Sequence, residues 1–273
     1  MAIAHPIEGT LFRMDGLPPK EQLPTQFDLP SEDPEEPGLP DEFHVYQPQL
    51  LRETFRPAAC DPDQVFIGTD INLYYDPRNP LWHKRPDWFA VLGSTRALRV
   101  QDLRFSYVVW QEEIAPYVVV ELLSPGTEDE DLGRRLWDLD KTPGKWVVYE
   151  RILKIPYYVV FSRHTGELQA FGRVSSRYRP IVLQEDRLWL PEAGIGLGLW
   201  EGLFAGCEGC WLRCFDAEGS WLPTVAEQRD LEHERAEQET RRADQEGQRA
   251  EQERLRAERL AERLRAMGVD PEA

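Results

Sequence analysis

The sequence predicts an α/β fold in which helices flank a central mixed sheet, followed by a long C-terminal helix or coiled coil. Two observations support this prediction. Through the middle of the chain, short apolar runs typical of buried strands alternate with helix-like segments. After residue 224 the composition changes abruptly to Glu, Arg, Gln, Ala and Leu, which is typical of a long, solvent-exposed helix.

The predicted elements follow one another from residue 49 to residue 183. The first is a short helix, and the next is a segment that alternates apolar and polar residues as a strand does. Two apolar runs then predict central strands, and a second helix has Thr142 as a plausible N-cap and Pro143 at its first position. In order, the predicted helices are residues 49–55 and 143–153, and the predicted strands are residues 65–75, 88–92, 117–123, 156–161, 167–172 and 178–183.

Composition divides the chain into three regions. Residues 1–45 contain ten acidic and two basic residues and many prolines, so we expect a loosely draped or disordered extension. Residues 46–222 have the pattern of a globular domain, and residues 224–273 form a charged tail. In the tail, small or apolar residues recur every seven positions, but glutamates at companion positions dilute this seam. A solvated helix and a dimer zipper are therefore both open. The recurring residues are Ala236, Ala243, Ala250, Ala257 and Leu264, and the diluting ones are Glu239, Glu246 and Glu253.

Charge and cysteine content narrow the classes of function. The formal net charge of the 273 residues is −17, which argues against a protein that coats nucleic acid, because such proteins need a basic surface. It does not exclude a nuclease, since metal ions can neutralise an acidic site locally. The sequence has no basic-then-apolar leader and no apolar stretch of about 18 residues, so we expect neither export nor a membrane span. Four cysteines favour a reducing cytoplasm.

Two carboxylates stand on neighbouring predicted strands. Asp87 directly precedes the strand at 88–92, where it could also be a turn residue that faces water. Glu121 lies inside the run at 117–123, where burying a free charge is costly, so Glu121 needs a metal or a cationic partner. A structural ion pair would meet that need equally well.

A lysine follows on the second predicted helix. Lys141 precedes the expected N-cap, whereas Lys145 falls in the first turn, four residues before Tyr149, so Lys145 and Tyr149 share a helix face. A lysine in the first turn opposes the helix dipole. This placement is easier to understand if Lys145 faces an acidic site, although a surface lysine is the alternative. Two acids and a lysine are the groups needed for metal-assisted phosphodiester hydrolysis.

These segments resemble a known family. Pro86-Asp87, the run Val-Val-Glu-Leu-Leu-Ser-Pro-Gly-Thr at 119–127, Lys145 with Tyr149, and the strand at 157–161 are similar to the Uma-type restriction endonuclease family of the PD-(D/E)xK nuclease superfamily. The resemblance covers residues 45–222 and implies a restriction-endonuclease-like core. The superfamily usually places its lysine two residues after the glutamate, where this chain has Leu123; in this family the lysine has moved to the following helix.

The resemblance implies a site and a reaction. Asp87 and Glu121 would be metal ligands, together with a backbone carbonyl near Leu122, and Lys145 would be the catalytic lysine. The expected cofactor is Mg²⁺, with Mn²⁺ as an alternative, and no organic cofactor is implied. The expected reaction is hydrolysis of DNA by a metal-activated water. Glu53 and Tyr149 are further candidates for groups that support the ligands.

Other functions and partners remain open at this stage. Cutting two strands favours two active sites, which makes a homodimer one expectation. The rival class is a catalytically silent protein that keeps the nuclease fold and binds a partner through its coiled-coil tail; a nuclease for RNA or another phosphodiester is a third option. Cys207, Cys210 and Cys214 lack a nearby fourth zinc ligand, so we expect buried free thiols rather than a zinc site.

Overall fold

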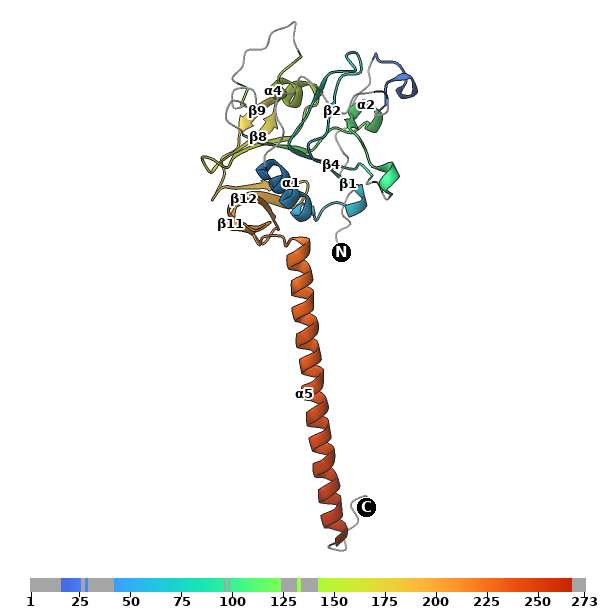
Figure 1. The fold of residues 1–273 in the computed structure, drawn as a ribbon, viewed down its shortest axis with the longest axis vertical. Helices are drawn as coiled ribbons and strands as arrows, with labels where there is room; N and C mark the ends of the chain where they lie inside the picture. The colour runs from blue at the N-terminus through green and yellow to red at the C-terminus, as the bar shows by residue number, and fades with distance from the viewer. Residues whose placement is uncertain are drawn as a thin grey trace. The chain divides into compact units, whose positions relative to one another are not determined.

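A computed structural model of the chain describes residues 16–25, 28, 42–95, 97, 99–123, 132–133 and 142–266. The chain forms two compact units, Met1–Leu222 and Pro223–Ala273. The first contains a central mixed sheet with helices, and the second contains a long helix (Figure 1). The predicted α/β class is therefore confirmed, and the architecture is consistent with a restriction-endonuclease-like fold.

The central sheet has six strands in the order β1-β4-β6-β7-β8-β9. The pair β6–β7 is parallel and all other neighbouring pairs are antiparallel. The carboxyl ends of β6 and β7 therefore lie at the same edge of the sheet as the beginning of β4. The strands are β1 (Val65–Gly68), β4 (Trp88–Leu92), β6 (Val118–Leu122), β7 (Tyr157–Ser162), β8 (Glu167–Val174) and β9 (Arg177–Pro180).

Alternation along the central strands separates two cores. In β6, Val118, Val120 and Leu122 join one hydrophobic cluster, whereas Val119 joins the other. The first cluster includes residues of α1 (Glu42–Thr54), so we call this side of the sheet the α1 face. The second includes residues of the π-helical turn η4 (Val148–Ile152), and we call it the η4 face. Because β6 is covered on both faces, any charged group on it is buried.

Helix α1 begins seven residues earlier than predicted. The predicted segment, 49–55, started after Pro48, but Glu42–Thr54 forms one helix that contains this proline. Tertiary contacts hold the helix in place. The buried Gln47 amide binds the backbone of Leu212 in both directions, with Nε2 2.7 Å from the Leu212 oxygen and Oε1 2.9 Å from its nitrogen. Figure 1 shows α1 between the central sheet and strands β11 and β12.

Two smaller sheets complete the first unit. One is antiparallel, and the other combines β2 and β5 in parallel with β3 antiparallel to β2. The predicted strand at 65–75 is divided between β1 and β2, because Asp70 turns the chain with a positive φ of 49°. The antiparallel sheet comprises β10 (Arg187–Leu190), β11 (Ile195–Phe204) and β12 (Cys207–Phe215); the other comprises β2 (Leu73–Tyr74), β3 (His83–Lys84) and β5 (Tyr107–Val108).

The remaining helical segments of the first unit are short. The second predicted helix, 143–153, consists of α4 (Lys145–Val147) followed by η4. The others are α2 (Val109–Glu112) and the 3-10 turns η1 (Lys20–Gln22), η2 (Pro62–Gln64) and η3 (Val100–Asp102).

Part of the N-terminal region packs against the rest of the first unit. Leu23 is buried in a cluster with Tyr74, Val108 and Trp110. The indole Nε1 of Trp110 donates to the Pro24 carbonyl at 2.8 Å. This short segment is therefore docked rather than draped, because it buries an apolar side chain and satisfies an indole donor. Most of the extension predicted at 1–45 lies outside the described residues.

The second unit consists mainly of α5 (Val225–Ala266). Its start is a capping box: the Thr224 hydroxyl accepts the Glu227 N–H at 3.2 Å, and the Glu227 carboxylate accepts the Thr224 N–H at 2.7 Å. Ion pairs such as Arg254 with Glu251 and Glu258 lie along its surface. None of the helices that the structure describes is both long enough and apolar enough to cross a membrane.

A buried carboxylate joins η4 to β9. Glu150 is 3% exposed; its Oε1 accepts the Tyr178 N–H at 2.8 Å, and its Oε2 accepts from Arg151 and Arg177, each at 3.1 Å. Burial alone would raise the pKa of this carboxyl, but these hydrogen bonds and the nearby Arg177 charge outweigh burial and lower the pKa. The ionised form of Glu150 therefore stabilises the fold.

Replacing this carboxylate should have a pH-dependent cost. We expect Glu150→Gln to lower the free energy of unfolding by about 2 kcal/mol at pH 7, because charge-assisted hydrogen bonds are lost. Since the folded pKa is depressed, the stabilisation is complete above the unfolded pKa and is lost as the pH falls through the folded one. Urea unfolding should show the difference between wild type and variant shrinking as the pH falls below the ordinary pKa of a glutamate. A difference that does not change with pH would contradict this account.

Candidate active site

A glutamate is fully buried in the central strand β6. Glu121 is 0% exposed, and both of its carboxylate oxygens accept hydrogen bonds from the following helical segment. Lys145 Nζ lies 3.0 Å from Oε2, and the Tyr149 hydroxyl lies 2.8 Å from Oε1. These are the cation and the donor that an ionised carboxylate at this depth requires.

Asp87 lies at the same level of the sheet as Glu121. The register pairs Trp88 with Val120 in antiparallel strands, so Asp87 and Glu121, one residue further along, stand opposite each other on the η4 face. The Asp87 Oδ2 atom accepts the N–H of Leu122 at 2.6 Å. The aspartate therefore continues the β4–β6 ladder through its side chain and is held next to the glutamate.

The lysine occupies the first position of α4. The predicted N-cap, Thr142, is wrong: the N-cap is Gly144, whose extended backbone (φ −62°, ψ 159°) lets the helix begin only at Lys145. Lys145 and Tyr149 contact opposite oxygens of one carboxylate, so they share a face as predicted. The Lys145 side chain is 20% exposed, so its ammonium group lies at the boundary between the core and solvent. Lys141 lies outside the described residues.

A histidine that the sequence analysis missed reaches the same edge from the α1 face. The Nε2 atom of His44, on α1, lies 3.2 Å from the carbonyl oxygen of Leu122. No sequence pattern marked His44, because the helix was predicted to start at residue 49. If the helix had been predicted to start before Pro48, His44 would have been placed on it.

Glu53 stands apart from these contacts. Its Oε1 accepts the side-chain amide of Gln49, one turn earlier on α1, at 3.0 Å. Helix α1 reaches the end of β6 at its start, through His44, whereas Glu53 lies nine residues later, about 13 Å further along the helix axis. Glu53 has no role in the site proposed below.

The donor set at this edge suits a hard divalent ion. The carboxylates of Asp87 and Glu121 and the Leu122 carbonyl are oxygen donors, and Mg²⁺ typically takes one or two carboxylates and keeps several waters. Each carboxylate has about four lone-pair positions, and Glu121 uses one on each oxygen to accept from Lys145 and Tyr149. Within the described residues, no three His, Cys, Asp or Glu side chains are grouped as a metal site.

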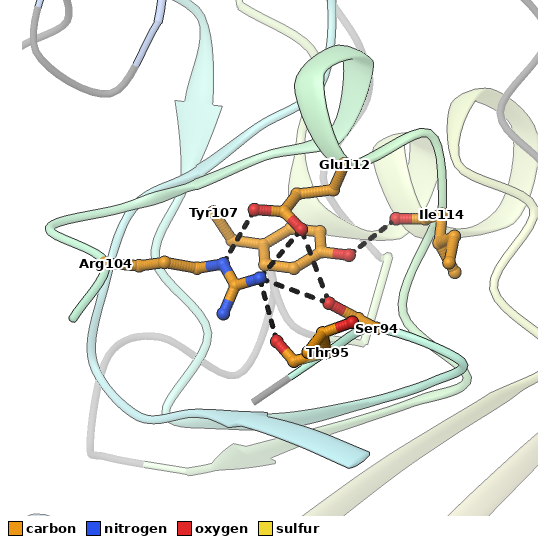
Figure 2. Close-up of polar contacts among 6 residues, drawn as sticks. All are labelled: Ser94, Thr95, Arg104, Tyr107, Glu112 and Ile114. Atoms are coloured by element: carbon orange, nitrogen blue, oxygen red, sulfur yellow. Dashed lines mark hydrogen bonds and ion pairs between the residues drawn. The ribbon is translucent and has the colours of Figure 1, made fainter. Parts of the chain in front are cut away.

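A second polar cluster, around Arg104, has a structural role. Arg104 donates to both Glu112 oxygens at 2.6 and 2.9 Å and also reaches Ser94 and the Thr95 carbonyl (Figure 2). Figure 2 also shows the Tyr107 hydroxyl directed at the Ile114 carbonyl, which accepts it at 2.9 Å. These contacts fasten the segment after β4 to α2 and direct the arginine inward.

The three cysteines of β12 differ in exposure. Cys207 is exposed, Cys210 is partly buried and Cys214 is buried, and all three are free thiols. The expectation of buried thiols is therefore wrong for Cys207, which follows directly on the turn that joins β11 and β12. Burial raises the pKa of Cys214 to about 12, so this thiol remains protonated and packs as a small apolar group.

Comparison with known families identifies the chain. The model of the family Uma2, described as "Putative restriction endonuclease", matches residues 9–205. The chain belongs to the Uma2 family. The match spans most of the first unit and contains Asp87, Glu121 and Lys145. It confirms the family resemblance and is consistent with the PD-(D/E)xK superfamily. No curated protein matched the chain.

Uma2 membership gives the site geometry a functional context. The family suggests an endonuclease-like protein with a divalent metal and DNA as substrate. The motif residues Glu121 and Leu122 are part of β6, whereas residues 124–127 of the same motif lie outside the described residues.

The buried pair can be tested for its dependence on both partners. We expect Lys145→Met to lower the free energy of unfolding by about 2–3 kcal/mol, because it leaves the Glu121 charge buried with one donor fewer. Adding Glu121→Gln should recover part of this loss, since the uncompensated charge disappears. A double-mutant cycle by urea unfolding measures the coupling. Additive effects would contradict a direct Lys145–Glu121 interaction.

Proposed function

We propose that this protein is a metal-dependent endonuclease that hydrolyses DNA phosphodiester bonds with an activated water. The observation that carries the proposal is the convergence of Asp87, Glu121 and Lys145 at one edge of the sheet. Family membership supports nuclease chemistry in general. The choice of DNA, of Mg²⁺ or Mn²⁺, and of these three residues is our proposal.

Each residue has a distinct role in this mechanism. Asp87 and Glu121, together with the Leu122 carbonyl, would hold the divalent ion. When bound, the ion supplies a water of lowered pKa and neutralises charge on the phosphate. Lys145 would orient the attacking water and stabilise the negative charge that develops on the phosphoryl oxygens. Tyr149 keeps the Glu121 carboxylate in position through its hydrogen bond.

The net charge of the chain is compatible with a DNA substrate. Residues 46–222 contain 20 basic and 25 acidic residues, so most of the formal charge of −17 comes from the regions before and after them. An acidic site attracts cations before it accepts phosphate. We therefore expect DNA binding to require the metal.

A cleavage assay tests the proposal. Wild type with Mg²⁺ or Mn²⁺ should nick or linearise plasmid DNA, and Glu121→Gln or Lys145→Met should each reduce the rate at least about 100-fold, because each removes a group that acts in the transition state. Glu53→Gln serves as the matched control and should cut at the wild-type rate. Single-stranded DNA and RNA substrates assay the alternatives to duplex DNA.

The assay can also contradict the proposal. Absence of cleavage with every metal and substrate would refute the proposed nuclease activity. Cleavage that survives both site substitutions would refute the residue assignment.

The second candidate function is binding through α5. Arginine recurs at 235, 242, 249, 256 and 263, directly before the positions of the alanine repeat. A straight helix drifts about 20° per heptad against such a repeat, so five heptads in phase favour a supercoiled pair. We propose that α5 joins two copies of the chain, which would also supply a duplex with two active sites.

The pairing of α5 predicts a mass change. The wild-type chain of 273 residues should have twice the chain mass by light scattering, whereas Ala243→Glu with Ala250→Glu should be monomeric, because charge enters the proposed seam. Gln245→Glu with Gln252→Glu adds the same charge on another side of the helix and should remain dimeric. A wild-type monomer, or equal behaviour of the two double variants, would refute this seam.

A further inference from the structure

Helix α1 brings a half-buried imidazole to the end of β6. Because a carbonyl oxygen can only accept, the 3.2 Å contact between His44 and Leu122 requires the hydrogen of the imidazole to be on Nε2. The contact joins residues 78 positions apart in sequence. It therefore depends on the tertiary fold and not on local helix geometry.

The direction of His44 is set by the packing of its neighbour. Phe43 stacks on Trp211 with ring centroids 5.7 Å apart and lies 6.0 Å from Phe161. The His44 ring meets Phe43 edge-on at 6.1 Å. One turn later, the two hydrogen bonds between the Gln47 amide and the Leu212 backbone connect α1 to β12. The start of α1 is thus anchored on two sides, which restricts where the imidazole can point.

Leu122 is held by side chains where the strand pairing stops. Its neighbour Leu123 donates to Phe161 in β7, so the polar groups of Leu122 point the other way, toward β4. The paired residues of β4 end at Trp88. Asp87 then accepts the Leu122 N–H, and His44 contacts the Leu122 carbonyl. The backbone N–H and C=O of Leu122 are thus both held by side chains, which come from different parts of the fold.

We propose that His44 is a positioning residue of the metal centre. Its hydrogen bond fixes the direction of the Leu122 carbonyl. This inference rests on the proposed function, in which that oxygen binds the ion. A carbonyl oxygen has two lone pairs; the imidazole N–H occupies one and leaves the other for the metal. His44 thus acts from the α1 face, whereas Lys145 and Tyr149 act from the η4 face.

The proposal predicts a loss of metal affinity. Groups that orient a metal ligand typically contribute about 10–100-fold to affinity, so His44→Leu should weaken Mn²⁺ binding by that factor in the full-length protein. His44→Gln should restore most of the affinity, because its amide N–H can occupy the place of Nε2–H. Gln49→Leu, on the exposed side of the same helix, is the matched control and should bind as wild type does.

Titration calorimetry with Mn²⁺, together with thermal unfolding of every variant, measures these effects. If His44→Leu binds Mn²⁺ as tightly as wild type while Glu121→Gln has lost binding, the role of His44 is refuted and the metal site stands. If wild type binds no Mn²⁺, or Glu121→Gln binds it equally well, the metal site itself is refuted. A nitrogen coupling in the Mn²⁺ spin-echo spectrum that disappears in His44→Leu would make His44 a direct ligand and overturn the positioning role.

Discussion

The charge of Glu121 at the centre of the sheet constrains the structure around it. Both faces of β6 are covered, so this carboxylate has lost its hydration and depends on protein donors. Lys145 and Tyr149 supply them from one short segment, which fixes the start of α4 against the η4 face. The same segment carries Glu150, which binds β9 in turn. One buried charge is thereby linked through consecutive residues to the outer strand of the sheet.

Glu121 lies near the carboxyl end of an inner strand, and the proposed metal site depends on this position. A pair deep inside the sheet would be closed off from solvent, whereas Lys145 is partly exposed and the ladder between β4 and β6 ends at Asp87. Asp87 and Lys145 are thus partly exposed beside the fully buried Glu121. Burial of Glu121 stabilises its orientation, and exposure of its neighbours provides access.

The strands could be predicted because they follow from local pattern, whereas the grouping of Asp87, Glu121 and Lys145 was implied by the family resemblance. The runs at 88–92 and 117–123 are apolar enough to identify buried strands, and their antiparallel pairing places Asp87 beside Glu121. The four-residue spacing of Lys145 and Tyr149 predicted one shared face. The start of α1 and the role of Gly144 could not be predicted, because tertiary packing around Pro48 and an extended glycine override local preference. His44 was missed for the same reason, since its partner is distant in sequence.

The π-helical turn has a consequence for how this segment can vary. In η4 the Leu153 N–H bonds the Val148 carbonyl five residues earlier, at 2.9 Å, so the turn holds one residue more than an α-helical turn would. This wider turn lets Tyr149 reach inward to Glu121 while the next residue, Glu150, reaches β9. Deleting one residue here would leave an ordinary α-helical turn and would change which residue faces Glu121 and which faces β9. Insertions and deletions in related chains should therefore avoid the stretch between Lys145 and the start of β7.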